Sequence, residues 1–418
     1  MNAGDVTHEA PETDTPACNF AVNTLTITSD YAVIIMWIYQ CRNWPNLTWD
    51  TATLAAKLAD VRHRQGRLLG RMESLGFALK REASLITLTH DVVKSSAIEG
   101  EYLNPEHVRS SIARKLGIES AGRIPAGRDV EGIVEIMLDA TRHCFAPLTE
   151  ERLFAWHAAL FPTGRRGMHR ITVGGWRTRD AGPMQVVSGP IGKETIHFEA
   201  PGAERLAKEM QALIQWFDHG DDMDPVLKAG VAHLWFVTIH PFEDGNGRIA
   251  RAVSDMALAR ADGVQDRFYS VSSQLEAERK DYYDRLEQQQ RSTPDVTDWL
   301  EWFLGCLGRA IAGAETMLDN ILFKARLWDV INQKPVNARQ RLIINRMLEA
   351  NFKGYINTSK YAKLAKCSTD TALRDIQELK NRGIVIQNPG GGRSTSYRLP
   401  EPPVEPAFSW QGHTPGDV

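Results

Sequence analysis

The amino-acid sequence predicts a mainly α-helical protein with one small β-hairpin and a separate basic domain near its C-terminal end. Apolar residues recur at helical spacing along most of the 418-residue chain. Residues 171–199 are the exception, because short apolar runs there alternate with glycine and proline. Residues 330–399 carry 13 Lys and Arg against four Asp and Glu, whereas the whole chain has a formal charge of −3.

Composition places the chain among globular proteins. Hydrophobic residues make up 43% and charged residues 24%, which suits a packed core and excludes disordered and fibrous classes. The five cysteines lie far apart without a CxxC pair. This spacing argues against a disulfide framework or a zinc site, and it predicts a reducing, cytoplasmic location. No apolar run approaches the roughly 20 residues that span a bilayer, so we expect no membrane attachment.

Both ends of the chain are predicted to be disordered tails, over 1–35 and 401–418. The first tail combines acidic residues and prolines with no Lys or Arg, and the second is rich in proline. Neither offers enough apolar surface to form a core.

The helices follow in order. Asp50 is expected to cap the first, which carries apolar residues at helical spacing from Leu54 to Leu75. A second covers 84–99, and a third begins at Asn104 because proline at 105 suits a first helical turn. Further helical patterns cover 127–143, 149–160, 203–218, 225–240, 247–260, 274–290 and 294–330. Short strands are expected at 173–175, 184–188 and 195–198, the last two forming the hairpin.

The segment from His240 to Arg251 reads His-Pro-Phe-Glu-Asp-Gly-Asn-Gly-Arg-Ile-Ala-Arg. It follows an almost uninterrupted apolar stretch over 226–239, which predicts a buried helix. Pro241 ends that helix, so His240 lies at its C-terminal end. The glycines then allow positive φ angles, which turn backbone N–H groups into one concavity at the start of the next helix. An anion there would meet free N–H donors and the positive end of the helix dipole.

The charged residues of this segment suit phosphate chemistry. Asp244 offers a hard oxygen ligand for Mg²⁺. Arg248 and Arg251 lie about one turn apart, where both could grip phosphate oxygens. His240 is suited to take a proton near neutral pH. Each residue alone also fits a structural role, but together they predict transfer of a phosphate-bearing group to a hydroxyl.

The segment resembles the HPFx(D/E)GNGRxxR signature of Fic-domain proteins at every defined position. The resemblance implies a Fic helical core that transfers AMP from ATP to a Tyr, Ser or Thr hydroxyl of a target protein, with Mg²⁺. It implies that His240 takes the proton of the target hydroxyl and that Asp244 holds Mg²⁺.

The same resemblance implies the phosphate contacts. Asn246 and the backbone of Gly245 and Gly247 would bind the α-phosphate. Arg248 would hold the β- and γ-phosphates, and Arg251 would assist at the γ-phosphate.

An upstream segment, Ser95-Ser-Ala-Ile-Glu-Gly100, is similar to the (S/T)xxxE(G/N) inhibitory motif of some Fic proteins. The resemblance implies that Glu99 pairs with Arg251 and keeps the γ-phosphate from binding productively. The alternative is an ordinary helix end stopped by Gly100. Tryptophans at 37, 44 and 49 resemble the opening of an N-terminal helical domain found in one bacterial branch of the family.

Two further elements complete the predicted site. The hairpin at 184–198 occupies the place of the family's flap, so Val186, Val187 and Ser188 are expected to pair with an extended target segment. Tyr282 and Tyr283 are predicted to lie beside the adenine, with stacked core aromatics as the alternative.

The basic C-terminal segment is predicted to be a winged helix-turn-helix domain, as appended to some Fic proteins. Two helices over 359–365 and 370–382 precede two strands that flank a glycine-rich loop. Leu373, Ile376 and Leu379 are expected to face inward. Arg374, Lys380 and Arg393 would contact DNA. The alternative is a dimerisation or target-docking module, which leaves a homodimer open.

We therefore expect a protein adenylyltransferase held at low activity by Glu99. The alternatives are a Fic enzyme with another donor, one that removes AMP, or a nucleotide-sensing DNA-binding regulator. The expected domains are an N-terminal helical domain over 36–115, a catalytic core over 116–325 and a winged-helix domain over 326–400.

Overall fold

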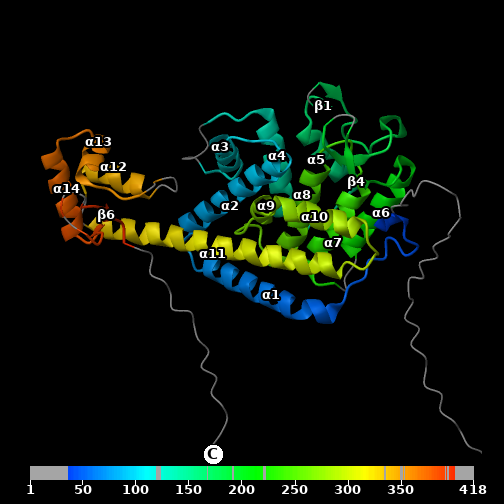
Figure 1. Ribbon diagram of the computed structural model, residues 1–418, viewed down its shortest axis with the longest axis horizontal. Helices are drawn as coiled ribbons and strands as arrows, with labels where there is room; N and C mark the ends of the chain where they lie inside the picture. The colour runs from blue at the N-terminus through cyan, green and yellow to red at the C-terminus, as the bar shows by residue number, and fades with distance from the viewer. Residues whose placement is uncertain are drawn as a thin grey trace, which may run out of the picture. The chain divides into compact units, whose positions relative to one another are not determined.

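The structure is a computed structural model that describes residues 36–118, 124–166, 168–190, 193–219, 223–333, 336–348, 352, 354–390, 392 and 395–400. The tails predicted over 1–35 and 401–418 lie outside the described residues. Helices dominate the described chain, which confirms the mainly α fold class (Figure 1). None of its helices is both long and apolar enough to cross a bilayer.

The α-helices are α1 (Thr51–Glu73), α2 (Phe77–Ile98), α3 (Pro105–Lys115), α4 (Arg128–Arg142), α5 (Glu150–Leu160), α6 (Leu206–His219), α7 (Pro225–Ile239), α8 (Asn246–Asp262), α9 (Val271–Ala277), α10 (Arg279–Gln290), α11 (Thr297–Gln333), α12 (Ala338–Met347), α13 (Thr358–Ala365) and α14 (Thr369–Asn381). The strands are β1 (Arg165–Arg166), β2 (His169–Arg170), β3 (Gln185–Ser188), β4 (Thr195–Glu199), β5 (Ile386–Gln387) and β6 (Tyr397–Arg398). Each strand pairs with its sequence neighbour in an antiparallel two-stranded sheet.

The predicted starts of the first and third helices are confirmed. The Asp50 carboxylate accepts a hydrogen bond from the backbone N–H of Ala52 at 2.9 Å and caps α1. Asn104 caps α3, with Pro105 at its first position. The second helix begins at Phe77, earlier than predicted, because residues 78–82 are all good helix formers.

Three elements differ from the prediction. The helix expected over 274–290 is two helices, α9 and α10, separated at Glu278. The strand expected at 173–175 is irregular backbone, because the N–H of Gly174 bonds to the His157 side chain instead of to a strand. Helix α12 was not predicted, although Asn337 and Gln340 form a capping box at its start.

The larger hydrophobic core, which extends from Leu54 to Ile321, is built around α7 and α8. Almost every residue of α7 is buried, which explains its continuous apolar sequence. Most of α8 is buried as well, and its turns pack against α7. Helix α1 lies along α11 (Figure 1), where ion pairs join Arg67 to Glu315 and Arg71 to Asp319. Helices α7 and α8, which adjoin the segment from His240 to Arg251, are therefore surrounded by other helices.

A second hydrophobic core belongs to the C-terminal part. Helix α11 contributes to both cores, supplying Ile321 to the first and Leu327 to the second. The helix is therefore continuous through the region where a domain boundary was expected. Helices α12, α13 and α14 complete the second core with strands β5 and β6. Ile376 and Leu379 of α14 face inward, whereas Leu373 is 50% exposed, so its predicted inward position is wrong.

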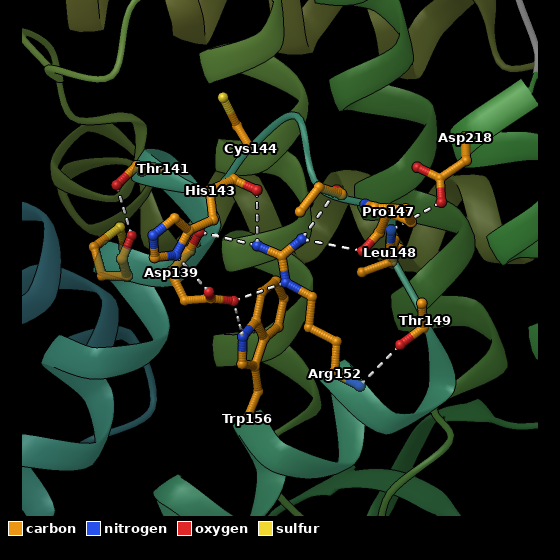
Figure 2. Close-up of polar contacts among 12 residues, drawn as sticks. Asp139, Thr141, His143, Cys144, Pro147, Leu148, Thr149, Arg152, Trp156 and Asp218 are labelled. Carbon is orange, nitrogen blue, oxygen red and sulfur yellow. Dashed lines mark hydrogen bonds and ion pairs between the residues drawn. The ribbon is translucent and has the colours of Figure 1, made fainter.

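The junction between α4 and α5 is held by the guanidinium group of Arg152 (Figure 2). Its Nε donates to Asp139 Oδ2 at 2.7 Å, and its other nitrogens donate to the backbone carbonyls of Asp139, His143, Ala146 and Pro147. Trp156 Nε1 donates to the same Asp139 oxygen at 2.8 Å. Burial would raise the pKa of Asp139, but these hydrogen bonds hold it below its ordinary value. The network fixes the start of α5, the helix that carries His157.

We expect Arg152→Met to lower the free energy of unfolding by roughly 1.5–3 kcal/mol, because it removes the charged donor that bonds to the Asp139 carboxylate and to the carbonyls of this junction. Thermal unfolding at neutral pH would measure the loss. Because the pKa of Asp139 is lowered in the folded state, its contribution is present above the unfolded pKa and lost as pH falls below about 4. The difference from wild type should therefore narrow at low pH. An equal difference at pH 3 and pH 7 would contradict the assignment.

Candidate functional site

His240 lies at the C-terminal end of α7 in a left-handed conformation, with φ 52°. Its Nδ1 lies 3.2 Å from the carbonyl oxygen of Val237, so Nδ1–H donates there and Nε2 is left as the proton acceptor. Burial lowers the pKa of His240 to about 4. The side chain is only half-buried, so a neutral imidazole at pH 7 presents one basic nitrogen to a substrate.

The backbone around His240 is held by Arg177, a buried residue that sequence reasoning missed. Arg177 Nε donates to the carbonyl oxygen of His240 at 2.8 Å, and its backbone N–H donates to that of Pro241 at 2.9 Å. Its Nη2 reaches the carbonyls of Ile239 and Pro201. One side chain therefore holds the left-handed turn and joins it to the chain that follows β4. Its sequence position in a glycine-rich loop gave no signal of this role.

His157 of α5 supports the other side of the same loop. Its ring stacks on Phe242, with centroids 4.1 Å apart and planes at 5°. Nε2 donates to the carbonyl oxygen of Asp244 at 3.2 Å, while Nδ1 accepts from the N–H of Gly174 at 3.2 Å. Burial lowers the pKa of His157 to about 4, which agrees with a neutral ring that donates once and accepts once. His157 is another functional residue that the sequence did not indicate.

The start of α8 is a candidate anion-binding turn. Gly245 has φ +80°, and a Cβ there would lie 3.0 Å from the ring of Phe161, so a side chain at this position would be strained. The Asn246 side chain accepts from the N–H of Phe242 at 2.9 Å and donates to its carbonyl at 2.8 Å. Asn246 thus shapes the loop through its amide, and its predicted contact with the α-phosphate stays a prediction. The N–H groups of the first turn could also meet an anion.

Arg248 and Arg251, on the first turns of α8, each carry a donor without a partner among the described residues. Arg251 donates from Nε to Ser95 Oγ at 2.9 Å and from Nη2 to Glu99 Oε1 at 2.8 Å. Arg248 Nη1 pairs with Glu101 Oε2 at 2.6 Å. Within the described chain, Arg251 Nη1 and Arg248 Nε are buried and have no hydrogen-bond partner. Buried donors without a partner are costly, and oxygens of a ligand could satisfy these two.

Glu99 lies between these arginines and the anion-binding turn. A Cβ on Gly247 would come within 2.1 Å of Glu99 Oε1, so the carboxylate rests against the backbone of the first turn of α8. Burial would raise the pKa of Glu99, but the charges of Arg251 and Arg248 hold it below its ordinary value. The carboxylate is therefore a resident anion at the position that suits a phosphate. The second acid, Glu101, was not identified from the sequence.

The Asp244 carboxylate could hold a metal ion only if a bound ligand supplied further oxygen atoms. Its Oδ1 accepts from the N–H of Gly245 at 2.7 Å. Among the described residues, no group of three or more His, Cys, Asp or Glu could hold a metal ion. One carboxylate beside a phosphate site nevertheless fits Mg²⁺, which proteins commonly bind through one or two carboxylates and substrate phosphates.

The remaining predicted site residues differ in their exposure and in the residues that they contact. Tyr282 is 2% exposed and its hydroxyl contacts the Nε2 of buried His233 at 2.8 Å. It is a core residue with no face open to adenine, which corrects its predicted role. Tyr283 is 38% exposed, and its hydroxyl donates to the carbonyl of Ile98 at 3.3 Å, beside Glu99. In β3, Val186 and Val187 are exposed with a bulge between them, and Ser188 is exposed at the end of the strand.

The region that carries this geometry matches the model of a known protein family. Residues 147–258, which include His157, Arg177 and the His240–Arg251 segment, match a family model described as the Fic/DOC family. The chain contains a Fic domain. A second model, described as a domain of unknown function (DUF4172), matches residues 37–118, which include Ser95 and Glu99.

Similar proteins include several adenylyltransferases. Protein adenylyltransferase fic-1 of Caenorhabditis elegans is 27% identical over 161 residues, 37% of this chain and 29% of that protein. Protein adenylyltransferase Fic of Culex quinquefasciatus is 26% identical over 247 residues, 58% of this chain and 44% of that one. The matched regions thus span less than half of these relatives. A solved Fic family protein from Desulfovibrio desulfuricans G20 aligns with 20% identity and a TM-score of 0.48, covering 84% of this chain and 97% of that one.

The lowered pKa of His240 predicts the acid limb of any reaction in which it accepts a proton. The limb of kcat/KM should lie below pH 6, near the free-site pKa of about 4. The limb of kcat should lie at higher pH, because bound phosphates favour the protonated imidazole. The Glu99→Gly variant is the protein to measure, since no carboxyl at 99 then titrates. Two coincident limbs at the ordinary histidine value would contradict this role, as would full turnover in His240→Ala.

Proposed function

We propose that this chain is a protein adenylyltransferase that moves AMP from ATP to a Tyr, Ser or Thr hydroxyl of a target protein. The observation that carries the proposal is that one loop joins a neutral His240, whose Nε2 is left as the proton acceptor, to the candidate anion-binding turn of α8. The Fic domain and the names of the similar adenylyltransferases support it.

In this proposal the residues divide the reaction between binding and proton transfer. The first-turn N–H groups of α8 hold the α-phosphate, and the free donors of Arg248 and Arg251 hold the phosphates beyond it. His240 Nε2 takes the proton of the target hydroxyl as it attacks. Asp244 would hold Mg²⁺, which when bound would neutralise phosphate charge. Arg177 and His157 position the loop without touching the reacting atoms.

The target is proposed to dock on the hairpin of β3 and β4. Val186 and Val187 lie on exposed strand β3. A short exposed strand of this kind can pair with an extended segment of another protein by β-augmentation. The docked segment of the target would then carry the acceptor hydroxyl. We place the reaction in the cytoplasm.

We further propose that Glu99 restrains this activity. Its carboxylate occupies one donor that a triphosphate would need, the Nη2 of Arg251, and the space against Gly247. A bound nucleotide would have to displace a carboxylate whose partner, Arg251, is 2% exposed. Breaking such a pair can cost several kcal/mol, and about 1.4 kcal/mol corresponds to a tenfold change in rate.

We therefore expect Glu99→Gly to raise AMP transfer roughly tenfold or more. Incorporation of labelled AMP into the chain itself and into lysate proteins would measure it. Adding Arg251→Ala should remove most of the gain, because the freed guanidinium is then absent.

Glu101→Gln is the matched control. Glu101 also pairs with a motif arginine, but its side chain is 50% exposed, so the pair is screened by solvent. Its removal should change transfer by no more than about fivefold. Equal activation by both substitutions would contradict a specific role of Glu99. If Glu99→Gly gave no activation under saturating Mg²⁺-ATP, Glu99 would be an ordinary helix end.

A second function is favoured by the surface of α14. Its exposed side includes Leu373, Arg374, Gln377 and Lys380. Arginine and glutamine read guanine and adenine edges in a major groove, and α13 with α14 has the order of a helix-turn-helix. The net charge of +9 over 330–399 suits a phosphate backbone. Arg393, the third predicted DNA contact, lies outside the described residues. We infer a DNA-binding regulator in the same chain as the transferase.

Arg374→Ala in the full chain should weaken binding to a selected DNA duplex by roughly 5- to 100-fold, because a base contact is lost. Gel-shift titration at fixed salt would measure it. Arg285→Ala, which removes an exposed arginine of α10, is the control and should bind as wild type. Failure to select any duplex, or equal binding by Arg374→Ala, would favour a protein-docking module.

A further inference from the structure

A pocket of about 610 Å³ lies beside the start of α8. Its walls come from the end of α2 and the residues after it, the start of α4, the end of α5 with the segment that follows, and Arg248 of α8. A Cβ on Gly245 would lie 3.1 Å from Leu160 and 3.0 Å from Phe161, and both of these residues line the pocket. The pocket therefore shares a wall with the candidate anion-binding turn.

Arg248 is the buried charged group of this pocket. Its side chain is 5% exposed, and its Nη1 pairs with Glu101. The guanidinium carbon lies 5.4 Å from the centroid of the Phe161 ring. The Nε of Arg248 has no hydrogen-bond partner within the described chain. A buried donor on the wall of a cavity is costly unless an oxygen atom of a ligand reaches it, so this wall is suited to an anion.

Two further arginines give the pocket a positive charge. Arg128 and Arg165 line it, both are exposed, and neither forms an ion pair among the described residues. The acids of the pocket are already engaged, since Glu101 pairs with Arg248 and the Asp129 carboxylate lies against the backbone at the start of α4. The unpaired guanidinium groups therefore favour a phosphate, which an arginine can hold through two parallel hydrogen bonds.

The rest of the lining is apolar or aromatic. Tyr102 is 83% exposed, so its ring is available for stacking, and Leu103 and Ile133 also line the pocket. The volume lies within the range of roughly 300–1,000 Å³ that is typical of pockets for small organic ligands. Arginines hold phosphates and an open aromatic ring stacks on bases, so the combination fits a nucleoside phosphate.

This pocket is separate from the predicted position of the adenine of ATP. That position is beside Tyr283 of α10, whose hydroxyl contacts the carbonyl of Ile98, before Glu99. The pocket instead takes Glu101 and Tyr102, after Glu99, and within the described chain no residue of α10 or of the β3–β4 hairpin lines it. A ligand in the pocket would thus lie beside the transfer site without occupying the adenine position.

We propose that this pocket binds a nucleoside phosphate. Its base stacks on Tyr102, and its phosphate is held by Arg128, Arg165 and the open Nε of Arg248. Two molecules have this chemistry: a separate nucleotide, and a dinucleoside polyphosphate whose phosphate chain passes Arg248 from the transfer site. No bond is made or broken in the pocket, so its occupancy can be measured whether or not the chain transfers AMP.

The test is the binding of AMP to the full chain, measured by titration calorimetry. We expect two molecules per chain, one in the transfer site and one in the pocket. Tyr102→Ala should weaken one of the two by roughly 5- to 100-fold, because base stacking is lost. Arg165→Ala should weaken the same one by roughly tenfold or more, because a charged donor is lost. Tyr355→Ala removes another exposed tyrosine, outside the pocket, and should bind as wild type.

Photolabelling locates the second molecule. On illumination, 8-azido-AMP crosslinks to residues beside its base, and it should label the peptide that contains Tyr102. Diadenosine tetraphosphate then separates the two sources of the ligand. If it spans both sites, one molecule displaces both AMP molecules; if the pocket takes a separate nucleotide, two molecules bind.

The outcomes separate this inference from the proposed function. One AMP per chain in both wild type and Tyr102→Ala, with no label on the Tyr102 peptide, would overturn the pocket and leave the proposed function intact. One AMP per chain that labels the Tyr102 peptide and is lost in Tyr102→Ala would support the pocket and contradict nucleotide binding at the transfer site.

Discussion

The turn between α7 and α8 is the constraint on which the site depends. Two buried helices meet there. A site for an anion requires that the N–H groups of the first residues of α8 remain available, while the other polar backbone groups of the loop need hydrogen-bond partners. The structure meets this demand with side chains from elsewhere. Arg177 satisfies the carbonyls at the end of α7, and His157 satisfies that of Asp244. The anion site is therefore a property of the packing around the loop as much as of the loop itself.

Charge balance at this turn is the second organising feature. Arg248 and Arg251 are nearly fully buried, and buried cations are stable only when paired. The end of α2 supplies Glu99 and Glu101 at the distances of ion pairs. In the proposed function, the phosphates would therefore compete with the carboxylates that balance these buried guanidinium groups.

The hairpin is connected to the turn more closely than its exposed position suggests. Arg177 touches the chain on both sides, since it bonds to His240 and to Pro201 after β4. Helix α10 makes a second link, because Tyr283 contacts the end of α2 while Glu287 holds His197 of β4. Single side chains therefore link the hairpin region to His240 and to the end of α2.

The sequence by itself determined the helical class, the position of His240 at a helix end and the glycine turn, because each depends on local spacing and backbone freedom. It also indicated Glu99 through a short pattern. It could not reveal Arg177, His157, Glu101 or the contact of Ser188 with His197, since these join segments that are distant along the chain or lie across a hairpin. It placed Tyr282 beside a ligand, whereas packing against His233 buried it. Such roles are set by which surfaces meet, and that is decided only when the helices pack.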